Sequence, residues 1–478
     1  MLLRELIAAT AAYPALGGVQ TAGDLGIEVE SVAYDSRRVG TGALYCCVPG
    51  LEVDGHQFAA EAVAAGAAAL LCERPVGAGV PEVRVPSVRA AMGPLAAVMA
   101  GEPSQRLDLV GFTGTNGKTT GTHLLVSILT TAGWPSAAIG TLTGARTTPE
   151  APDLQFALAQ HLSEGIRAVA MEVSSHALAQ HRVDGCRFRV AVFTNLSRDH
   201  LDYHGDINAY FRTKARLFEP SLSDRAVVDL DDSHGRLLFD AATIPTVGYS
   251  LADAGDIEVS RHGSRFTWRG HAVNLALTGR FNVSNALAAA TAAAELGIET
   301  ATIAAGLDSS GPVPGRFEQV PTDQPFSVVV DYAHTPDGLA HALEAARELA
   351  GGHRVMLVFG CGGDRDRSKR PEMGRIAADR ADVAVLTSDN PRSEDPLAII
   401  EQVAAGVVDR SCLTVVPDRA DAIAVAIGRA GRGDVVLLAG KGHETTQVIG
   451  DRVLDFDDRA VAAQALAARG GGLEEAHA

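Results

Sequence analysis

Residues 107–120, which read LDLVGFTGTNGKTT, join an apolar strand pattern to a Gly/Thr-rich turn. Gly114 and Gly117 have no side chain, so the backbone there can turn several N–H groups toward one anion, and the following helix adds its positive N-terminal end. Lys118 would bring a point charge to terminal phosphates, and the Thr119 hydroxyl would be a ligand for Mg²⁺. We therefore predict nucleotide-phosphate binding by Gly114, Thr115, Asn116, Gly117, Lys118, Thr119 and Thr120.

One position departs from the usual GxxxxGK[ST] pattern of such turns. Phe112 stands where the first glycine is expected, and Gly111 lies one step earlier. A Gly/Thr turn before a helix also occurs in proteins that bind no nucleotide. Because an apolar strand precedes the turn and apolar residues recur at helical spacing from Leu124 to Leu129, phosphate binding is the favoured interpretation.

Polar residues follow several other predicted strands in the same way. Glu172 ends one strand, Asp199 and His200 follow a second, Asp331 ends a third, and GCGGDR follows a fourth. In open α/β sheets the ligand crevice lies at the carboxyl ends of the strands, so we expect these clusters to converge on it. The alternative for each cluster alone is a turn or a helix cap, for which Asp, Asn and Ser are common.

Mg²⁺ prefers oxygen ligands alongside substrate phosphates, and Thr119 and Glu172 fit that role. We predict His200 as a ligand of a second ion, whereas His204 is interpreted as a hydrogen-bonded turn histidine. Asn282 and Asn285 begin an Ala-rich helical stretch, where they are either helix caps or readers of an adenine edge. The parts suit activation of a molecule with ATP, but the turn alone leaves open hydrolysis-coupled motion, phosphoryl transfer and ligation.

The composition limits the class of protein. At 478 residues the chain is long enough for about three domains, and 46% apolar residues can supply several cores. A net charge of −17 argues against a nucleic-acid or anionic-membrane surface. The six cysteines show no CxxC pairs, and no run of 18 uncharged apolar residues occurs. We predict a cytoplasmic protein with no nucleic-acid partner and no membrane insertion.

The strands and helices that must position these residues fall into three segments. The first has short strands such as Leu44–Val48 and an Ala-rich helix near 57–69. Strands alternate with helices in the second and third segments, as in doubly wound parallel sheets. The clearest strands are expected at Ala168–Glu172, Val190–Thr194, Ala226–Asp229, Ser327–Asp331, Val355–Phe359, Val383–Thr387 and Val435–Ala439. We predict an α/β protein with domains at residues 1–105, 106–320 and 321–478, the last two joined by the proline-rich GPVPGRFEQVPTDQP.

Several motifs together resemble the Mur ligases of peptidoglycan precursor synthesis: GTNGKTT, MEVSSHAL, NLSRDHLDYHG, GRFNVSNALAA, GRFE and DYAHTP. Within that family, TTPEAPDLQ, the HRV that follows MEVSSHALAQ, and FGCGGDRDRSKRP are similar to the members that add the third amino acid. The family turn also lacks the first glycine. The resemblance implies an N-terminal nucleotide-sugar-binding domain, a central P-loop ATPase domain and a C-terminal Rossmann-like domain. It also implies that ATP phosphorylates the carboxylate of a nucleotide-linked dipeptide, and that an amino acid then attacks the acyl phosphate.

The resemblance assigns further residues. Lys214, which alone would be read as a surface lysine of an amphipathic helix, matches a lysine that the family carries as a carbamate, beside a second Mg²⁺ and His200. Arg316 and Asp331 match positions around the nucleotide, and Asn282 is included there. A family His-Gln pair near the uridine stands here as Leu51-Glu52, so this chain departs from the family pattern at that contact. Ser36 matches a contact to the uridine nucleotide, and Thr147, Thr148, Ser174, Gln180 and Arg182 match contacts to the muramoyl-dipeptide.

The DNPR run of Asp389, Asn390, Pro391 and Arg392 resembles the sequence motif that distinguishes the family members that add meso-2,6-diaminopimelate. That molecule is a lysine with a second carboxylate at its far end, which a guanidinium can hold with two hydrogen bonds. The resemblance adds Arg365 for a carboxylate, Gly440, and Glu444 for an ammonium group. Alone, DNPR would be read as a turn.

Other functions remain open from the sequence. A lysine-adding relative or a folylpolyglutamate-synthase-like ligase would share the ATP chemistry. A P-loop ATPase or switch protein would hydrolyse ATP without both other substrates. A non-catalytic binding subunit is disfavoured by the intact Lys118, Glu172 and Lys214. We expect a monomer whose partners are its small-molecule substrates.

Overall fold

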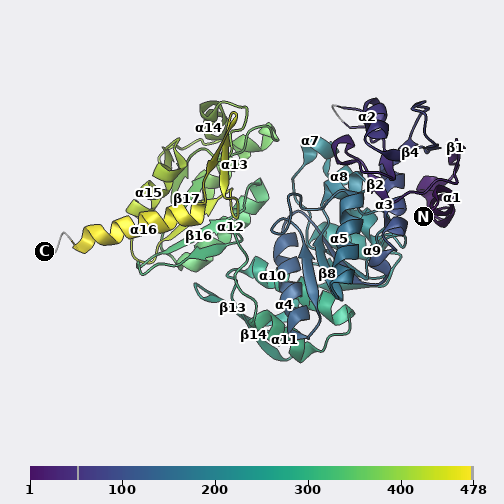
Figure 1. Ribbon diagram of the computed structural model, residues 1–478. Coiled ribbons are helices and arrows are strands. Elements are labelled where there is room, and N and C mark those ends of the chain that lie inside the picture. Colours follow the sequence, from purple (N-terminus) through teal and green to yellow (C-terminus); the bar gives the residue numbers. More distant parts are fainter. Residues whose placement is uncertain (51–52, 475–478) are drawn as a thin grey trace.

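A computed structural model describes residues 1–50 and 53–474, and Figure 1 shows its three sheet-containing regions following one another along the chain. The first region has a five-stranded sheet in the order β1-β5-β4-β3-β2, in which only β1 is antiparallel to its neighbour. Its strands are β1 (Gln20–Ala22), β2 (Ser31–Ala33), β3 (Ala43–Cys46), β4 (Ala67–Cys72) and β5 (Glu82–Arg84), and its helices are α1 (Leu3–Ala9), α2 (Ala59–Ala64) and α3 (Val88–Met99).

The predicted helix near 57–69 is wrong in extent. The α-helix α2 ends at Ala64, and residues from Ala67 onward form strand β4. Ala67 and Ala69 are buried in that strand, where small side chains fill the space between the sheet and its neighbours. Alanine favours a helix when it is judged locally, but here tertiary packing decides its conformation.

The central region has a six-stranded, wholly parallel sheet in the order β11-β10-β9-β6-β8-β7. Its strands are β6 (Asp108–Thr113), β7 (Ser136–Ile139), β8 (Ala168–Glu172), β9 (Val190–Phe193), β10 (Ala226–Asp229) and β11 (Thr246–Tyr249). Helices α4 (Lys118–Thr131) and α10 (Arg280–Glu295) share one core with this sheet, and Leu124, Leu125 and Leu287 are fully buried there. In this strand order β6 lies inside the sheet, between β8 and β9. The chain adds β7 and β8 on one side of β6 and then β9, β10 and β11 on the other, so the end of β6 is a topological switch point.

The remaining elements of the central region surround that sheet. They are α5 (Ala151–Ser163), α6 (Ser175–Ala179), α7 (Leu201–His204), α8 (Ile207–Ala215), α9 (Ser233–Ala241) and α11 (Thr300–Asp308), with a small antiparallel sheet of β12 (Ala254–Ser260), β13 (Gly263–Trp268) and β14 (His271–Leu275).

The C-terminal region has a second six-stranded sheet, in the order β15-β16-β20-β17-β18-β19, with β15 antiparallel and the others parallel. Its strands are β15 (Glu318–Val320), β16 (Ser327–Asp331), β17 (Val355–Phe359), β18 (Val383–Leu386), β19 (Leu413–Val415) and β20 (Val435–Ala439), followed by the hairpin β21 (Thr446–Ile449) and β22 (Arg452–Asp455). Its helices are α12 (Pro336–Ala350), α13 (Arg370–Arg380), α14 (Pro396–Ala404), α15 (Arg419–Arg429) and α16 (Asp458–Glu474).

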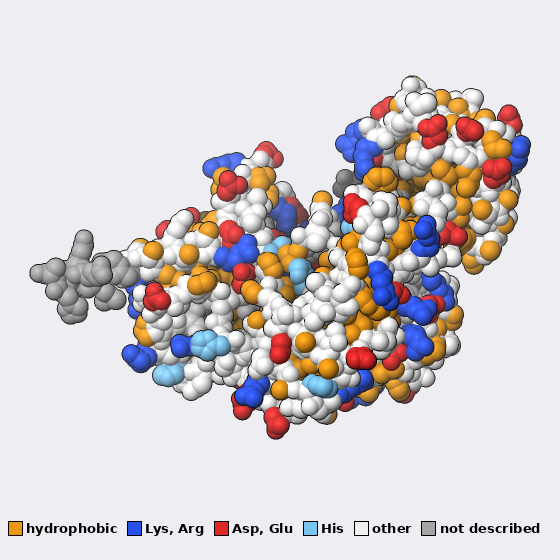
Figure 2. All heavy atoms as spheres, turned by 60° about the horizontal axis from the view of Figure 1, so that its bottom comes forward, with side chains coloured by type: hydrophobic (Ala, Val, Ile, Leu, Met, Phe, Trp, Pro, Cys, Tyr) orange, Lys and Arg blue, Asp and Glu red, His pale blue; other side chains and the backbone are white. Residues whose placement is uncertain are grey.

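The predicted α/β class with doubly wound parallel sheets is confirmed, while the domain boundaries stay predictions. Figure 2 shows a hollow in the middle of one face, in which histidine side chains are visible. Within residues 1–50 and 53–474, no helix has the length and apolar character needed to span a membrane.

Candidate active site

The loop after β6 forms a cradle, residues 114–117, whose shape requires glycine. Gly114 has φ 149° and Gly117 has φ 87°, a region that side chains disfavour. A Cβ on Gly114 would lie 1.9 Å from Thr194 Oγ1. The end of β9 holds the loop, because Thr115 N donates to Asn195 O and Asn116 N donates to Asn195 Oδ1, each at 2.9 Å. The cradle thus presents the N-terminus of α4 to an anion.

Two lysines converge on the cradle. Lys118 Nζ and Lys214 Nζ each donate to Gly114 O at 2.8 Å, and Lys118 Nζ also donates to Thr115 O at 2.8 Å. Lys214 is only 1% exposed, so the surface-lysine interpretation is wrong. Burial lowers the pKa of both lysines, that of Lys214 well below its usual value, and the charge of Lys118 lowers the pKa of Lys214 further.

Thr119 and Glu172 are in direct contact, as expected of two ligands of one ion. Thr119 Oγ1 donates to Glu172 Oε2 at 2.9 Å and accepts from Arg316 Nη2 at 3.1 Å. Glu172 is 2% exposed, and its Oε1 accepts from Thr141 N at 2.8 Å. Arg316 precedes β15, so this contact ties the junction to the cradle. These buried oxygen atoms have the chemistry that Mg²⁺ prefers.

His200 lies at the other predicted metal position. It has φ 54°, its Nε2 lies 3.2 Å from Asp199 Oδ2, and its ring centroid is 4.6 Å from that of His176. Partial burial lowers its pKa. His204 Nε2 is 3.0 Å from Ser175 Oγ, in agreement with a hydrogen-bonded histidine.

The predicted ligands are therefore not all brought together: Thr119 contacts Glu172, whereas Lys214 contacts Gly114. Within the described ranges no three His, Cys, Asp or Glu side chains are arranged to hold a metal ion. A metal site here would need oxygen atoms from a substrate or from a modified lysine to complete it.

Asn282 and Asn285 are not helix caps, because α10 begins at Arg280 with Gly279 at its N-cap. Asn282 is 0% exposed, and its Nδ2 donates to Thr278 O at 2.9 Å. Asn285 Nδ2 donates to Asn282 Oδ1 at 3.2 Å, and a Cβ on Gly117 would lie 2.3 Å from Asn285 Oδ1. Asn285, rather than Asn282, thus lies directly against the cradle.

Asp331, at the end of β16, accepts hydrogen bonds from Phe317 N at 2.7 Å and from Ala333 N at 2.8 Å. Burial raises the pKa of this carboxyl group. The guanidinium of Arg316 stacks 4.4 Å above the ring of the next residue, Tyr332. Asp331 therefore holds the backbone next to Arg316, whose side chain contacts Thr119 at the cradle.

The residues predicted to hold the dipeptide form one network beside Glu172. Thr148 Oγ1 donates to Glu172 O at 2.9 Å and accepts from Ser174 N at 3.1 Å. Arg182 donates to Thr148 O at 3.0 Å and to Gln180 Oε1 at 2.7 Å. Thr147 Oγ1 lies 3.0 Å from Thr141 Oγ1, which also contacts Glu172.

Ser36 lies apart from this network, in the first region, where its Oγ is 3.4 Å from Glu61 Oε1. The expected uridine contact at Leu51-Glu52 lies outside the described residues.

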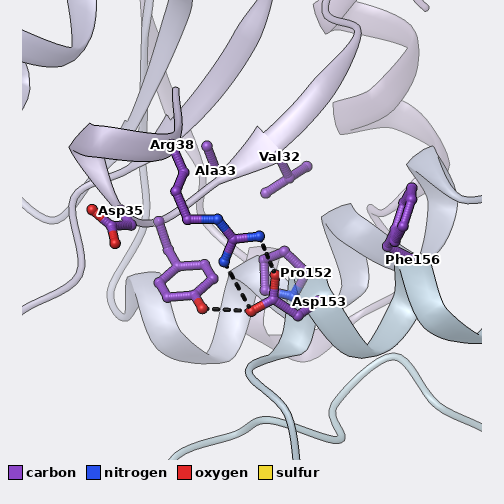
Figure 3. Close-up of a pocket in the computed structure, with 8 residues that line it drawn as sticks. Val32, Ala33, Asp35, Arg38, Pro152, Asp153 and Phe156 are labelled. Carbon is purple, nitrogen blue, oxygen red and sulfur yellow. Dashed lines mark hydrogen bonds and ion pairs between the residues drawn. The ribbon is translucent and has the colours of Figure 1, made fainter. Parts of the chain in front are cut away.

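A cavity of about 220 Å³ separates β2 from α5, and Figure 3 shows its lining. Tyr34 donates to Asp153 Oδ2 at 2.5 Å, and Arg38 Nη2 lies 3.1 Å from Asp153 Oδ1. Burial, followed by the hydrogen bond to Asp153, raises the pKa of Tyr34 to about 12. These contacts join the first and central regions, and the cavity contains none of the predicted site residues.

The DNPR run and the GKGHE run meet in the C-terminal region. Asn390 Nδ2 donates to Glu444 Oε2 at 2.7 Å. Gly440 has φ 116°, and a Cβ there would lie 3.0 Å from Asp389 Oδ2. Burial and the charge of Asp389 raise the pKa of Glu444. Pro391, which lies between Asn390 and Arg392 in the sequence, is buried.

Arg392 and Arg365 lie on neighbouring loops. Arg392 has φ 52°, and its Nη1 donates to Gly363 O at 2.7 Å. Its backbone is fixed by Val448 O, which accepts from Arg392 N at 3.0 Å. Arg365 is exposed, and its Nη1 donates to Asp364 O at 3.1 Å. Both guanidinium groups are thus held by backbone oxygen atoms of the 363–364 segment.

Lys441 was missed by the sequence analysis. It is 0% exposed, and its Nζ donates to Thr446 O at 2.6 Å, to Glu444 Oε2 at 3.3 Å and to Asn390 Oδ1 at 3.5 Å. Its position between Gly440 and Glu444 in GKGHE was the available signal. Lys441 holds two of the predicted acceptor-binding residues together.

Three family models match most of the chain. They are the Mur ligase family, catalytic domain, at residues 28–99, the Mur ligase middle domain at 112–293, and the Mur ligase, glutamate ligase domain, at 315–442. The matches follow the three sheet-containing regions in order.

Similar proteins cover nearly the whole chain. A UDP-N-acetylmuramoyl-L-alanyl-D-glutamate--2,6-diaminopimelate ligase of Geobacillus kaustophilus is 48% identical, with 93% of this chain and 96% of that protein covered. A protein of the same name from Gloeobacter violaceus is 45% identical, with 98% and 99% covered. A solved structure with that enzyme name is 34% identical with a TM-score of 0.69, over 98% of this chain and 99% of that chain. A MurF ligase of Thermotoga maritima in complex with ADP has a TM-score of 0.63 at 20% identity, covering 94% and 99%, and shows a shared fold.

Proposed function

Because the chain belongs to the Mur ligase family, we propose that it adds meso-2,6-diaminopimelate to UDP-N-acetylmuramoyl-L-alanyl-D-glutamate, with ATP, in peptidoglycan precursor synthesis. The observation that carries the choice of amino acid is the meeting of Glu444 and Asn390 beside Arg392. An acceptor whose far end bears both an ammonium and a carboxylate fits a site in which the run that carries the Arg392 guanidinium contacts the Glu444 carboxylate through Asn390.

The phosphoryl-transfer half of the reaction falls to the cradle. ATP would phosphorylate the terminal carboxylate of the dipeptide, giving an acyl phosphate and ADP. The cradle N–H groups and Lys118 would hold the phosphates, and Arg316 would approach them from the junction. Neutralising the charge where phosphate meets carboxylate lowers the barrier, because two anionic groups otherwise repel.

Mg²⁺ fits the oxygen atoms of Thr119 and Glu172, and we propose a second ion held by His200 and a carbamate on Lys214. Bound Mg²⁺ would neutralise phosphate charge and orient the phosphoryl group. The burial and low pKa of Lys214 support the carbamate, because CO₂ adds to a neutral amine and the product carries a carboxylate-like charge.

The second half joins the acceptor. The acceptor amine would attack the acyl carbon, form the peptide bond and expel phosphate. Arg365 and Arg392 would hold acceptor carboxylates, while Glu444 would hold an ammonium group, with Asp389, Asn390, Pro391 and Gly440 shaping the site. Thr147, Thr148, Ser174, Gln180 and Arg182 would hold the dipeptide, Ser36 the uridine nucleotide, and Asn282 and Asp331 would support the ATP site. In a cell this activity would serve wall growth, shape and division from the cytoplasm.

The test compares acceptors. Purified protein is incubated with ATP, Mg²⁺, the nucleotide-dipeptide and either diaminopimelate, lysine or ornithine, and the amide product is measured with ADP release. We expect product with diaminopimelate and at least about 10²-fold lower kcat/KM with lysine. ADP release without both other substrates would instead indicate an ATPase, and equal use of lysine would refute the acceptor assignment.

A further inference from the structure

The two loops that carry the acceptor arginines are fitted directly against each other. We call residues 362–365 the GGDR loop and residues 389–394 the DNPR loop. Gly363 N donates to Asn390 O at 2.8 Å, and a Cβ on Gly363 would lie 1.8 Å from Pro391 O. The loops therefore touch backbone to backbone, and any shift of one against the other would move Arg365 relative to Arg392.

An ion pair between the buried Arg370 and the partly buried Glu394 links the same two loops, and the exposed Arg367 also lies 3.2 Å from Glu394 Oε2. Arg370 is 0% exposed and donates to Glu394 Oε1 and Oε2, each at 2.9 Å. Arg370 Nη2 also donates to Gly362 O at 3.1 Å, while Glu394 Oε1 accepts from Asp364 N at 2.7 Å. The Arg370 guanidinium holds the pKa of Glu394 at about 2, so this carboxylate is charged at any working pH. Arg370 and Glu394 thus each form a hydrogen bond with the backbone of the GGDR loop, in addition to their contact with each other.

Two solvent-exposed hydrogen bonds between Ser393 and Asp364 also link the two loops. Ser393 Oγ donates to Asp364 Oδ1 at 2.7 Å, and Ser393 N donates to Asp364 Oδ2 at 3.2 Å. The two loops are therefore linked by the backbone hydrogen bond between Gly363 and Asn390, by the Arg370–Glu394 pair and by the hydrogen bonds between Ser393 and Asp364.

A buried ion pair seldom adds net stability, because the loss of hydration offsets much of the attraction. A two-bond guanidinium–carboxylate contact does fix direction and distance. The Arg370–Glu394 pair is thus better explained by the geometry that it imposes than by stability.

We propose that Arg370 and Glu394 are positioning residues for acceptor selection: they lock the GGDR and DNPR loops so that Arg365 and Arg392 keep the separation that a second acceptor carboxylate requires. This inference rests on the proposed function. Lysine lacks the second carboxylate, so its use does not depend on that separation.

The test is Glu394→Gln, which keeps the side-chain shape and removes the charge. The matched control is Asp434→Asn in the same sheet region: Asp434 is 4% exposed, accepts from Arg354 Nε and Nη2 at 3.1 and 2.6 Å, and precedes β20, whereas Gly440 follows that strand. We expect Glu394→Gln to raise the KM for diaminopimelate about tenfold, with kcat and the KM for ATP within about twofold of wild type. The preference for diaminopimelate over lysine should fall by a similar factor, and Asp434→Asn should change none of these.

Two further variants keep the test decisive if Glu394→Gln is poorly folded. Ser393→Ala removes only an exposed bond and should raise the same KM by a smaller factor. Arg370→Gln in the Glu394→Gln background should add little, because the two residues act as one unit. An unchanged KM in Ser393→Ala and Glu394→Gln, or equal changes in the Asp434→Asn control, would overturn the inference. Failure of the wild type to use diaminopimelate would instead overturn the proposed function.

Discussion

The cradle and the acceptor loops hold their positive charges in opposite ways. At the cradle, Lys118 and Lys214 both donate to one carbonyl oxygen, that of Gly114, and within the described ranges neither lysine has a carboxylate within ion-pair distance. Behind the acceptor loops, the buried Arg370 is paired with Glu394, and the buried Lys441 with Glu444. The guanidinium groups of Arg365 and Arg392, the first exposed and the second half-buried, are held by backbone contacts alone.

This difference separates two uses of charge. At the cradle, the compensation of the Lys118 charge comes from bound anions and, in the proposed site, from the carbamate on Lys214, so the charge itself does the binding. In the acceptor region, the Arg370–Glu394 pair would set the geometry of the loops, while Arg365, Arg392 and Glu444 would contact the acceptor. Changes at the cradle should therefore abolish the reaction, whereas changes at the acceptor loops should alter which amino acid is used.

Loss of Lys118 should have the largest effect. Lys118→Met removes the cation nearest the transferred phosphate, and we expect kcat/KM to fall by at least about 10³-fold. The free protein should keep its melting temperature or gain slightly, because a buried cation beside Lys214 is removed. Steady-state kinetics and thermal melting check both parts. Arg375→Met, which removes a half-exposed cation of α13, is the control and should change neither. A Lys118→Met enzyme within tenfold of wild type would contradict a charge-based cradle.

Lys214 tests whether a modification supplies the missing negative charge. We expect Lys214→Ala to lose about 10²-fold in kcat, and Lys214→Glu to lose less, because a carboxylate restores the charge of a carbamate. Carbon-13 NMR of protein equilibrated with labelled bicarbonate should show a carbamate signal that is absent from Lys214→Ala. An unmodified amine in fully active enzyme would refute this prediction.

Arg392 tests the acceptor side of the comparison. Arg392→Ala should lower kcat/KM for diaminopimelate about 10²-fold, because a charged two-bond contact is lost, while the KM for ATP stays within about twofold. Arg392→Lys should recover only part, since an ammonium group cannot form the fork. Competition between diaminopimelate and lysine measures the change. A parallel rise in the KM for ATP would show that the two regions are not separable.

The sequence predicted the strands better than the environment of single residues. Strands Ala168–Glu172 and Val355–Phe359 were predicted with the bounds that the structure has, because strands buried on both faces read as continuous apolar runs. The burial of Lys214 could not be seen locally, since its partner Gly114 lies 100 residues away. The Arg370–Glu394 pair was missed for the same reason, because its partners are 24 residues apart, whereas Lys441 had a local signal in GKGHE that was not used.

Asp229 extends the comparison to a buried charge without a proposed ligand. It ends β10 and is 7% exposed, and burial, with the charges of Asp231 and Asp232, raises its pKa to about 6. The folded protein thus binds this proton more tightly than the unfolded chain, whose Asp pKa is about 3.9. The stability that this proton provides is complete below about pH 4 and is lost as the pH rises through about 6.

Asp229→Asn has no charge to bury, so the variant should be more stable than wild type by about 3 kcal/mol at about pH 8 and equal to it at about pH 4. Urea unfolding at both pH values measures the difference, and kcat should not change. A variant that is less stable at both pH values would show that the hydrogen bonds from Ser284 Oγ at 3.3 Å and Asp231 N at 2.8 Å outweigh the buried charge. The predicted outcome would show that burial of the Asp229 charge costs more stability than these two hydrogen bonds return.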